Sequence, residues 1–285
     1  MRSAAHVCIP GIPEDLFLKA INLAIARNAP YVPPSTTDAL LYIRPVIFGS
    51  GPQLQLQPSF SYTFCVFVLP AAAYHGADAL DALVMEDFDR AAPKGTGCAK
   101  VGGNYAPVIR WSNKAKEEGY GITLHLDSKT QTTIEEFSTS GFLGIKEDKD
   151  GVTLVVPDSG NVIESITSDS CMQMAKHLGW KVEKRAVRGA FRSHYTDHSP
   201  TNTEIRTQIP FSSLGSFTEV LAVGTAAALV GIKSITRRST NETFSYSYTE
   251  SAMGKNSEKL RNAVKEVQTG RAKDSFGWLQ RVVNA

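Results

Sequence analysis

Three longer stretches of the chain carry apolar residues at helical spacing. Residues 13–28 place their apolar side chains on one face of a predicted helix, and the two acidic residues after Pro13 are typical of a helix start. Residues 167–178 predict a second helix, which Gly179 is suited to end because glycine readily adopts the left-handed conformation. Residues 256–268 predict a charged amphipathic helix, and residues 113–119 a short one.

The apolar runs between these helices are short and predict β-strands. They occupy residues 39–48, 59–69, 122–127, 133–137, 152–156, 181–186, 218–222 and 226–232. Residues 149–151, Lys-Asp-Gly, predict a hairpin turn, and residues 79–90 look only semi-regular. The run at 39–48 is typical of a buried strand, so the charged Arg44 within it needs a partner or a ligand. A structural ion pair and a bound ligand are both open at this point.

One segment breaks the pattern. Residues 187–208 are polar and have no apolar period. More than twenty residues without regular structure are unusual inside a compact domain. We interpret residues 187–208 as a disordered surface insertion.

Composition describes an ordinary globular protein. The chain has 285 residues, of which 42% are hydrophobic and 20% charged, and its net charge of +2 does not indicate nucleic acid or an anionic membrane as a partner. The longest apolar run, residues 220–232, is shorter than the roughly 20 residues of a membrane span, and residues 1–9 lack the apolar core of a secretory signal. We therefore expect a soluble protein of the cytoplasm, with the mitochondrion as the open alternative.

The four cysteines do not form a recognisable framework. Cys8, Cys65, Cys98 and Cys171 are widely spaced and include no Cys-x-x-Cys pair, which argues against a zinc site and against disulfides. We predict no metal site. Cys98 is close to the lysine discussed next, but we interpret it as a small packing residue rather than a nucleophile.

The candidate chemistry begins with a lysine among glycines. Residues 95–107 read Gly-Thr-Gly-Cys-Ala-Lys-Val-Gly-Gly-Asn-Tyr-Ala-Pro, and Lys100 is their lysine. Glycine has no Cβ, so this backbone can approach a flat ligand closely, and a lysine held there can be desolvated and form a Schiff base. The order differs from that of a phosphate-binding loop, in which the lysine directly follows a glycine. A surface lysine in a glycine-rich turn is the alternative.

Further blocks accompany the lysine. They are the Leu-Tyr-Ile-Arg-Pro of residues 41–45, the Thr-Ile-Glu-Glu-Phe-Ser-Thr-Ser of residues 133–140, the Val-Gly-Thr-Ala-Ala of residues 223–227, and the closing residues 268–272 and 276–279. In this succession the chain resembles the fold-type IV pyridoxal-phosphate enzymes, and among them the branched-chain amino acid aminotransferases, in a fungal-like form. The resemblance covers nearly the whole chain apart from the insertion. It implies an α+β fold, with mixed sheets in a pseudo-barrel and flanking helices.

The resemblance also implies a place for the ring of pyridoxal 5'-phosphate. Lys100 would bind it as a Schiff base, Tyr105 would hydrogen-bond the ring hydroxyl, and Glu136 would face the ring nitrogen and keep it protonated. Strand alternation sends one of Glu135 and Glu136 inward and the other to solvent, and the resemblance gives the inward role to Glu136. Two surface acids on an edge strand are the alternative.

The cofactor phosphate is implied at two backbone segments. Ile166 and Thr167 open the predicted helix, where free N–H groups and the helix dipole favour an anion. Thr167 as a mere N-cap is the alternative. Gly224-Thr225-Ala226 is a turn with consecutive amides, which suit a phosphate oxygen at Thr225 and a substrate carboxylate at Ala226. A plain hairpin turn is the alternative there.

For the substrate, the resemblance implies contacts from Tyr42, Arg44, Thr139 and Ala226. Tyr42 and Arg44 are two apart on a strand and therefore project from the same face. The implied reaction passes the amino group of a branched-chain or similar apolar L-amino acid to 2-oxoglutarate. The expected partners are these small molecules and a second copy of the chain in a homodimer.

Two departures qualify the resemblance. Gly141 stands where the family usually has an asparagine, and most of the small N-terminal domain, with its phosphate-binding arginine, has no counterpart, since Arg2 is too near the terminus to replace it. We expect residues 1–70 to be the remnant of that domain and residues 71–285 to be the cofactor-binding domain. The alternatives are a non-catalytic remnant, another fold-type IV transaminase or lyase, and an enzyme of specialised metabolism.

Overall fold

The computed structural model describes residues 2–37, 39–71, 78–186, 208–226, 228–248 and 252–282. The chain divides into two compact units, Met1–Gly76 with Glu266–Ala285, and Ala77–Lys265. The C-terminal residues 266–285 thus group with the first unit, whereas we expected them in the cofactor-binding domain. The predicted insertion at 187–208 lies outside the described residues except for its last residue.

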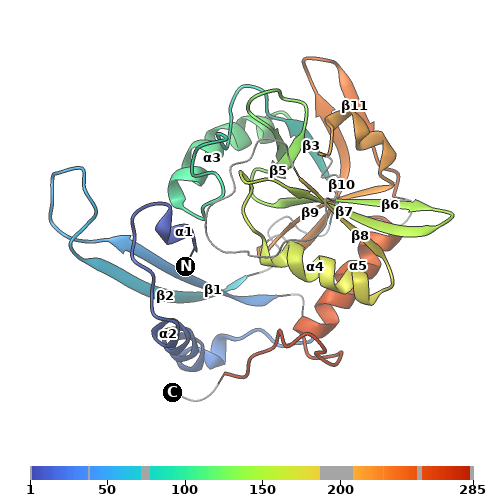
Figure 1. The fold of residues 1–285 in the computed structure, drawn as a ribbon. Coiled ribbons are helices and arrows are strands. Elements are labelled where there is room, and N and C mark those ends of the chain that lie inside the picture. The colour runs from blue at the N-terminus through green and yellow to red at the C-terminus, as the bar shows by residue number, and fades with distance from the viewer. Residues whose placement is uncertain are drawn as a thin grey trace, which may run out of the picture. The chain divides into compact units, whose positions relative to one another are not determined.

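The first unit contains a helix against a two-stranded sheet (Figure 1). Its elements are α1 (Arg2–Ala5), α2 (Glu14–Arg27), η1 (Ala29–Tyr31), β1 (Leu40–Gly49) and β2 (Tyr62–Ala71). β1 and β2 are antiparallel, and α2 packs on one face of them, where Phe17 stacks on Phe64 with 5.9 Å between ring centroids. The helix predicted at 13–28 is confirmed.

The strand predicted at 39–48 forms as β1, but the expectation that it is buried was wrong. Val46, Phe48, Phe67 and Leu69 are exposed large hydrophobic residues of the two strands. They alternate with the residues that face α2, because successive side chains of a strand point to opposite faces. A ribbon of two strands has one face covered by α2, and among the described residues of this unit the large hydrophobic side chains of the other face stay exposed.

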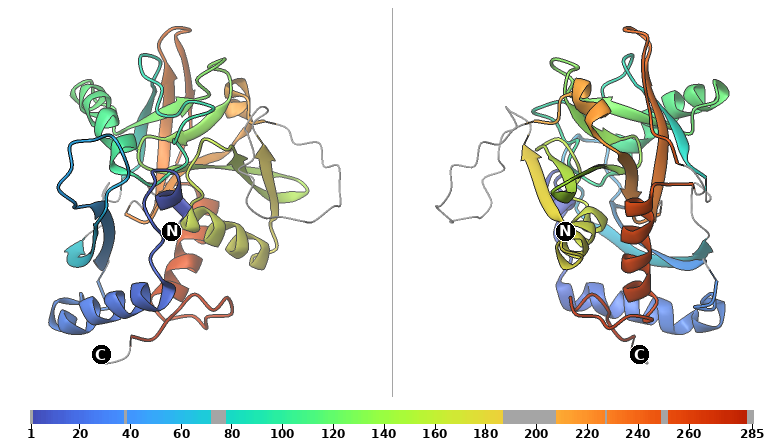
Figure 2. Two further views of the ribbon diagram at one scale, coloured as in Figure 1. Left: turned by 60° about the vertical axis from the view of Figure 1, so that its left-hand side comes forward. Right: turned by 90° about the vertical axis from the view of Figure 1, so that its right-hand side faces the viewer.

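The second unit is built on a sheet that closes on itself. Its strands are β3 (Leu80–Val84), β4 (Ile122–Leu126), β5 (Ile134–Phe137), β6 (Gly141–Asp148), β7 (Gly151–Asp158), β8 (Lys181–Ala186), β9 (Glu219–Gly224), β10 (Ala228–Arg237) and β11 (Glu242–Ser245). β10, β3, β4, β5, β6 and β9 pair in that order, and β9 pairs back to β10. β11 extends the sheet beside β10, while β7 and β8 extend it beside β6, and the two views of Figure 2 show these extensions.

The pairing within this sheet is mixed. β10 with β3, β3 with β4, and β7 with β8 are parallel, and the other pairs are antiparallel. The predicted α+β class with mixed strands in a pseudo-barrel is therefore confirmed. Sequence patterning missed β3, β6 and β11. In β3 the successive residues Ala82, Leu83 and Val84 are all buried, so this parallel strand lacks the apolar–polar alternation that marks a half-buried strand.

Helices flank this closed sheet (Figure 1). They are α3 (Gly102–Glu117), the 3-10 turn η2 (Phe211–Ser216), α4 (Ile166–His177) and α5 (Lys255–Gln268). α3 packs on β4, and α4 packs on β7, β8 and β9. α4 ends as predicted, with Gly179 at a φ of +79°. The short helix predicted at 113–119 is only the end of α3, which starts two residues after Lys100 and accommodates Pro107.

The core of the second unit fills the closed sheet. Phe137 and Phe142 stack at 5.8 Å between centroids, and Phe217 meets Phe142 edge-on at 5.9 Å. All three rings are at most 5% exposed. Because β5 carries Phe137 into this core, the neighbouring residues of β5 have a fixed position.

Candidate active site

Two adjacent acids on β5 are both buried, which contradicts the alternation that we expected. In the register of β4 and β5, His125 pairs with Glu136 and Leu126 pairs with Ile134, so Glu135 is the extra residue of a β-bulge. A bulge sets two residues of one strand against one of the other and locally breaks the alternation. Glu135 and Glu136 are 3% and 5% exposed, so neither side chain points to solvent.

Glu136 forms an ion pair with Arg90, which is also buried. Arg90 donates from Nη2 to the carbonyl oxygen of Gly97 at 3.2 Å, three residues before Lys100. Burial lowers the pKa of Arg90, and the nearby Tyr105, Glu135 and Cys98 oppose that shift. Arg90 thus joins the acid on β5 to the loop that carries the lysine.

Sequence reasoning did not single out Arg90. Its partners lie 7 and 46 positions away in the chain, so no local spacing pointed to them. The only available signal was a lone basic residue at the end of the semi-regular segment 79–90.

Glu135 has a different environment from Glu136. It accepts hydrogen bonds from Asn161 Nδ2 at 2.7 Å and from Ser159 Oγ at 3.2 Å. Burial raises the pKa of Glu135, and these two hydrogen bonds oppose the rise. Glu135 thereby ties β5 to the loop that contains Ser159 and Asn161.

That loop also touches the lysine loop. A Cβ on Gly97 would overlap Ala91 and lie 3.0 Å from the carbonyl oxygen of Asn161, so only glycine fits there without movement. Asn104 Nδ2 donates to the carbonyl oxygens of Thr96 at 2.7 Å and Ala99 at 2.9 Å. The lysine loop is therefore closely held by its surroundings.

Lys100 stands between this loop and α3. Its Nζ donates to Tyr105 Oη and lies 4.3 Å from the centroid of the tyrosine ring. Lys100 is exposed, as in the alternative of a surface lysine, although we expected that the glycine-rich loop could hold it desolvated. Ala99 is fully buried, and the chain emerges directly after it to begin α3, which brings Lys100 to the surface of the unit.

The start of α4 has the free N–H groups of an anion site. Ser165 is its N-cap and accepts from the backbone N–H of Ser168 at 3.1 Å, so the alternative that Thr167 caps the helix was wrong. Ile166 and Thr167 are the first two helical residues, and N–H groups at these positions have no acceptor within the helix. Ile166 is 82% exposed.

Two turns meet beside this helix start. A Cβ on Gly141 would lie 3.1 Å from Ser168 Oγ, so the position where the family usually has an asparagine lies tightly against α4. A Cβ on Gly224 would lie 3.6 Å from Ser140 Oγ and 3.7 Å from the carbonyl oxygen of Thr139. The segments that carry the predicted site residues Thr139, Ile166, Thr167, Thr225 and Ala226 are thus neighbours, with Thr139, Thr225 and Ala226 exposed.

Tyr42 and Arg44 belong to the first unit, on the face of β1 that α2 leaves open. They share that face as predicted, and Arg44 Cζ lies 4.9 Å from the centroid of the Tyr42 ring. Arg44 is exposed, and among the described residues no carboxylate forms an ion pair with it. The structural ion pair that we considered for Arg44 is therefore not formed in this part of the chain.

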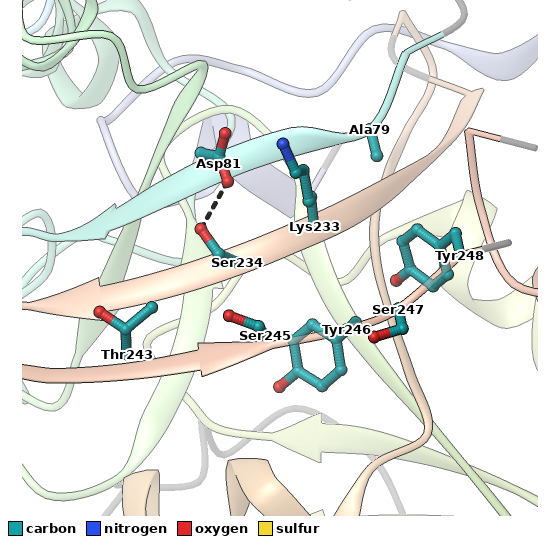
Figure 3. Close-up of a pocket in the computed structure, with 9 residues that line it drawn as sticks. All are labelled: Ala79, Asp81, Lys233, Ser234, Thr243, Ser245, Tyr246, Ser247 and Tyr248. Carbon is teal, nitrogen blue, oxygen red and sulfur yellow. Dashed lines mark hydrogen bonds between the residues drawn. The ribbon is translucent and has the colours of Figure 1, made fainter.

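A cavity of about 590 Å³ opens between β3, β10 and β11 (Figure 3). None of the predicted site residues lines it. Three of its polar side chains are already paired, since Ser234 Oγ donates to Asp81 Oδ1 at 2.5 Å and Tyr248 Oη donates to the carbonyl oxygen of Ile232 at 2.8 Å. This cavity is therefore a weaker candidate than the region around Arg90.

Comparison with known proteins places the chain in a family. Residues 1–235 match the sequence model of the family described as amino-transferase class IV. This chain belongs to the class IV aminotransferases. The recognition made from the lysine block and the Tyr-Ile-Arg-Pro block is confirmed, and the chain is a transaminase.

The relatives of this class IV aminotransferase include fungal enzymes. An aminotransferase of Gibberella zeae is 48% identical over 284 residues, which are 99% of this chain and 69% of that protein. The branched-chain amino acid aminotransferase gloG of Glarea lozoyensis is 43% identical over 284 residues, 99% of this chain and 73% of that protein. The branched-chain aminotransferase of the thermophilic archaeon Thermoproteus uzoniensis, solved with norvaline, has a TM-score of 0.74 at 20% identity, over 99% of this chain and 80% of that one. At that identity the last comparison supports the fold.

Class IV aminotransferases use pyridoxal phosphate, and the residues of this class IV aminotransferase fit it. The fit consists of an amine at Lys100, a buried acid at Glu136 with its cation, and helical N–H groups at the start of α4. Ser140 Oγ is buried and has no hydrogen-bond partner in the described part of the chain, so a donor beside the turn of Gly224 is still to be satisfied. Within the described residues no cluster of three His, Cys, Asp or Glu could hold a metal ion, and no helix is long and apolar enough to cross a membrane.

Proposed function

We propose that this aminotransferase moves the amino group of a branched-chain or similar apolar L-amino acid to 2-oxoglutarate, with pyridoxal phosphate attached to Lys100. The observation that carries the proposal is the pair of contacts made by Arg90. Its guanidinium touches both the carbonyl of Gly97 in the lysine loop and the carboxylate of Glu136. A pyridoxal phosphate ring bound between the Lys100 amine and the Glu136 carboxylate requires that the lysine loop and β5 are held in fixed positions.

Each residue then has a defined task toward the cofactor. Bound pyridoxal phosphate supplies a ring that withdraws electrons from the substrate Cα when its nitrogen is protonated. Glu136 holds the proton on that nitrogen, and Tyr105 hydrogen-bonds the ring hydroxyl. The backbone N–H groups of Ile166, Thr167 and Thr225 bind the phosphate.

Lys100 Nζ would hold the cofactor, and once the substrate amine has replaced it there, the freed amine would carry the proton that leaves the substrate Cα. Tyr42, Arg44, Thr139 and the backbone N–H of Ala226 orient the substrate. The open face of β1 and β2 supports an apolar substrate side chain, because Phe67 pairs with Arg44 and Leu69 with Tyr42 in the register. Val46 and Phe48, further along β1 on this face, are also exposed, and we take them to favour a homodimer.

The test is covalent attachment at Lys100. Purified chain is titrated with pyridoxal phosphate and reduced with borohydride. The protein is then digested, and the mass of the peptide that contains Lys100 is measured by mass spectrometry. We expect the mass of the reduced cofactor on that peptide. In Lys100→Ala we expect no attached cofactor and no absorbance of a protein-bound ring. Attachment that persists in Lys100→Ala would refute the assignment.

The two adjacent acids provide a matched pair for the ring nitrogen. Glu136→Gln removes the acid assigned to it, and a lost charge-assisted contact of about 1.5–3 kcal/mol corresponds to roughly ten- to hundredfold weaker cofactor binding. Glu135→Gln changes the neighbour, which is tied to Ser159 and Asn161 instead. We expect cofactor binding to weaken in Glu136→Gln and to stay near wild type in Glu135→Gln. The reverse ranking would move the role to Glu135.

A chain that binds no cofactor is the second candidate, and the exposure of Lys100 favours it. Wild-type chain without saturable binding of pyridoxal phosphate would establish this alternative. If the cofactor binds, the rates with leucine, isoleucine and valine, compared with alanine and phenylalanine as amino donors, define the substrate class.

A further inference from the structure

Asn161 is a buried residue that the proposed reaction does not use. It lies in the loop of residues 159–165 between β7 and α4, and it is 7% exposed. Its side-chain Nδ2 donates to Glu135 Oε1 at 2.7 Å, and its backbone N–H donates to Ser159 Oγ at 3.1 Å. Ser159 Oγ in turn donates to the same carboxylate oxygen at 3.2 Å. The 159–165 loop is therefore fixed to β5 through the acid next to Glu136.

The backbone of Asn161 meets the lysine loop. Its carbonyl oxygen would lie 3.0 Å from a Cβ on Gly97, so the two backbones are in close contact. The carbonyl oxygen of Gly97 accepts from Arg90, which also forms the ion pair with Glu136. Gly97 is thus held by a hydrogen bond from Arg90 and packed against Asn161. It lies three residues before Lys100, so Asn161 helps to fix where the lysine begins.

The same loop leads directly into the helix start that we assign to the cofactor phosphate. Ser165, the N-cap of α4, follows Asn161 by four residues, and the N–H groups of Ile166 and Thr167 come next. Four residues span at most about 14 Å, so the anchor at Asn161 restricts where these N–H groups lie. One short loop therefore connects the strand of the ring acid, the lysine loop and the start of α4.

We propose that Asn161 is a positioning residue that sets the distance between the phosphate site at the start of α4 and the ring site at Lys100 and Glu136. The phosphate and the ring belong to one small molecule, so both bind at once only if the two sites are held at a matching distance. A loop that is already fixed removes the cost of ordering the two sites on binding. The inference deepens the proposed function and rests on it, since it concerns the same cofactor.

The experiment exchanges the donor and the acceptor of the hydrogen bond between Asn161 and Glu135. Asn161→Asp has nearly the same shape but sets two carboxylates against each other, whereas Glu135→Gln keeps an acceptor for Asn161. The double variant Asn161→Asp/Glu135→Gln restores an amide–carboxylate pair with the roles reversed. Each protein is titrated by absorbance with pyridoxal phosphate and with pyridoxal, which lacks the phosphate. Thermal unfolding reports whether the fold is retained.

The ratio of the two affinities measures what the phosphate adds to binding. We expect Asn161→Asp to lower this ratio about tenfold, the equivalent of one lost hydrogen bond at the phosphate. Glu135→Gln should keep the wild-type ratio, and the double variant should regain most of it. A general loss of stability would weaken the binding of both ligands alike and leave the ratio unchanged.

Asn256→Asp is the matched control. Asn256 is also 7% exposed, and its Nδ2 donates to a buried glutamate, Glu219, at 3.1 Å. That pair anchors the start of α5, which carries none of the predicted site residues. Asn256→Asp should therefore lower the Tm and leave the affinity ratio unchanged.

An unchanged ratio in Asn161→Asp, or a double variant no better than Asn161→Asp, would overturn the proposal. An equal fall of the ratio in Asn256→Asp would also overturn it, because the effect would then not be specific to the 159–165 loop. If Asn161→Asp does not fold, Asn161→Ala replaces it, since this change removes the donor without adding a charge and should lower the ratio in the same direction. A wild-type chain that binds no pyridoxal phosphate would instead reject the proposed function, and this inference with it.

Discussion

Removing Arg90 should cost this protein more stability than removing any exposed arginine. The side chains of Arg90 and Glu136 are 3% and 7% exposed. Arg90→Met would leave a buried carboxylate without its cation, which costs about 3–5 kcal/mol. Part of that cost is the hydrogen bond to Gly97, worth about 1.5–3 kcal/mol for a charged donor. Since a domain has only about 5–15 kcal/mol of stability, the loss is large.

The assay is urea unfolding of the chain without added pyridoxal phosphate, so that ligand binding does not contribute to stability. The expected loss corresponds to a fall of roughly 6–20 °C in Tm for a unit of this size. Glu136→Met should lower the stability by a similar amount, because it leaves the buried guanidinium of Arg90 without its carboxylate partner. The double variant Arg90→Met/Glu136→Met buries no charge and should regain most of the lost stability, while cofactor binding stays impaired.

Arg237→Met is the control. Arg237 also pairs with a glutamate, Glu86, at 2.8 Å, but the two side chains are 17% and 23% exposed. A more exposed pair should contribute about 1 kcal/mol or less. The reasoning fails if Arg90→Met costs no more than Arg237→Met, or if the double variant loses the sum of the two single losses.

Two further predictions concern the elements around the site. Burial alone would raise the pKa of Asp127, but hydrogen bonds from the backbone N–H groups of residues 130, 133 and 132 and from the Thr130 hydroxyl outweigh it and lower the pKa from 3.8 to about 2. Asp127 then stabilises the fold by at most about 2 kcal/mol above its unfolded pKa, and this is lost as pH falls toward 2. In urea unfolding, the free energy of unfolding of wild type should exceed that of Asp127→Asn by less at pH 3 than at pH 6. An equal difference at the two pH values would contradict this. Gly97→Ala forces the lysine loop away from Ala91 and should lower stability by about 1–3 kcal/mol and weaken cofactor binding, measured by Tm and by titration. Gly95→Ala, whose Cβ would meet Ala92 at 3.4 Å, is its control and should be nearly neutral, so equal effects would count against the fitted loop.

Local patterns predicted local structure well. The helix of residues 167–178 and its stop at Gly179 follow from spacing within a single turn, and the structure has them as α4. The start of α3 was missed because Gly102, Gly103 and Pro107 all disfavour a helix by propensity, and packing on β4 overrides that. The open face of β1 could not be foreseen either, because it depends on how many elements cover the strand.

The contacts of the candidate site were harder to foresee than its residues. The lysine, the tyrosine and the glutamate could be named from motifs. The bulge at Glu135 depends on the register between β4 and β5, which no residue type reveals. Arg90 had no motif because it meets Glu136 only through the folded sheet. The sequence alone indicates which types of residue can carry the chemistry. The long-range pairing of strands decides which of these residues come into contact.

The extra residue at Glu135 also constrains how this protein can change over time. Glu135 and Glu136 face inward together only because one position on β5 has no counterpart on β4. Deleting a single codon there would restore the regular pleat and turn one carboxylate out to water, even if every other amino acid were kept. The hairpin at residues 148–151 has no such dependence, since it lies at the exposed tip of two strands. Insertions and deletions between homologues should therefore collect at that tip and be rare at the bulge.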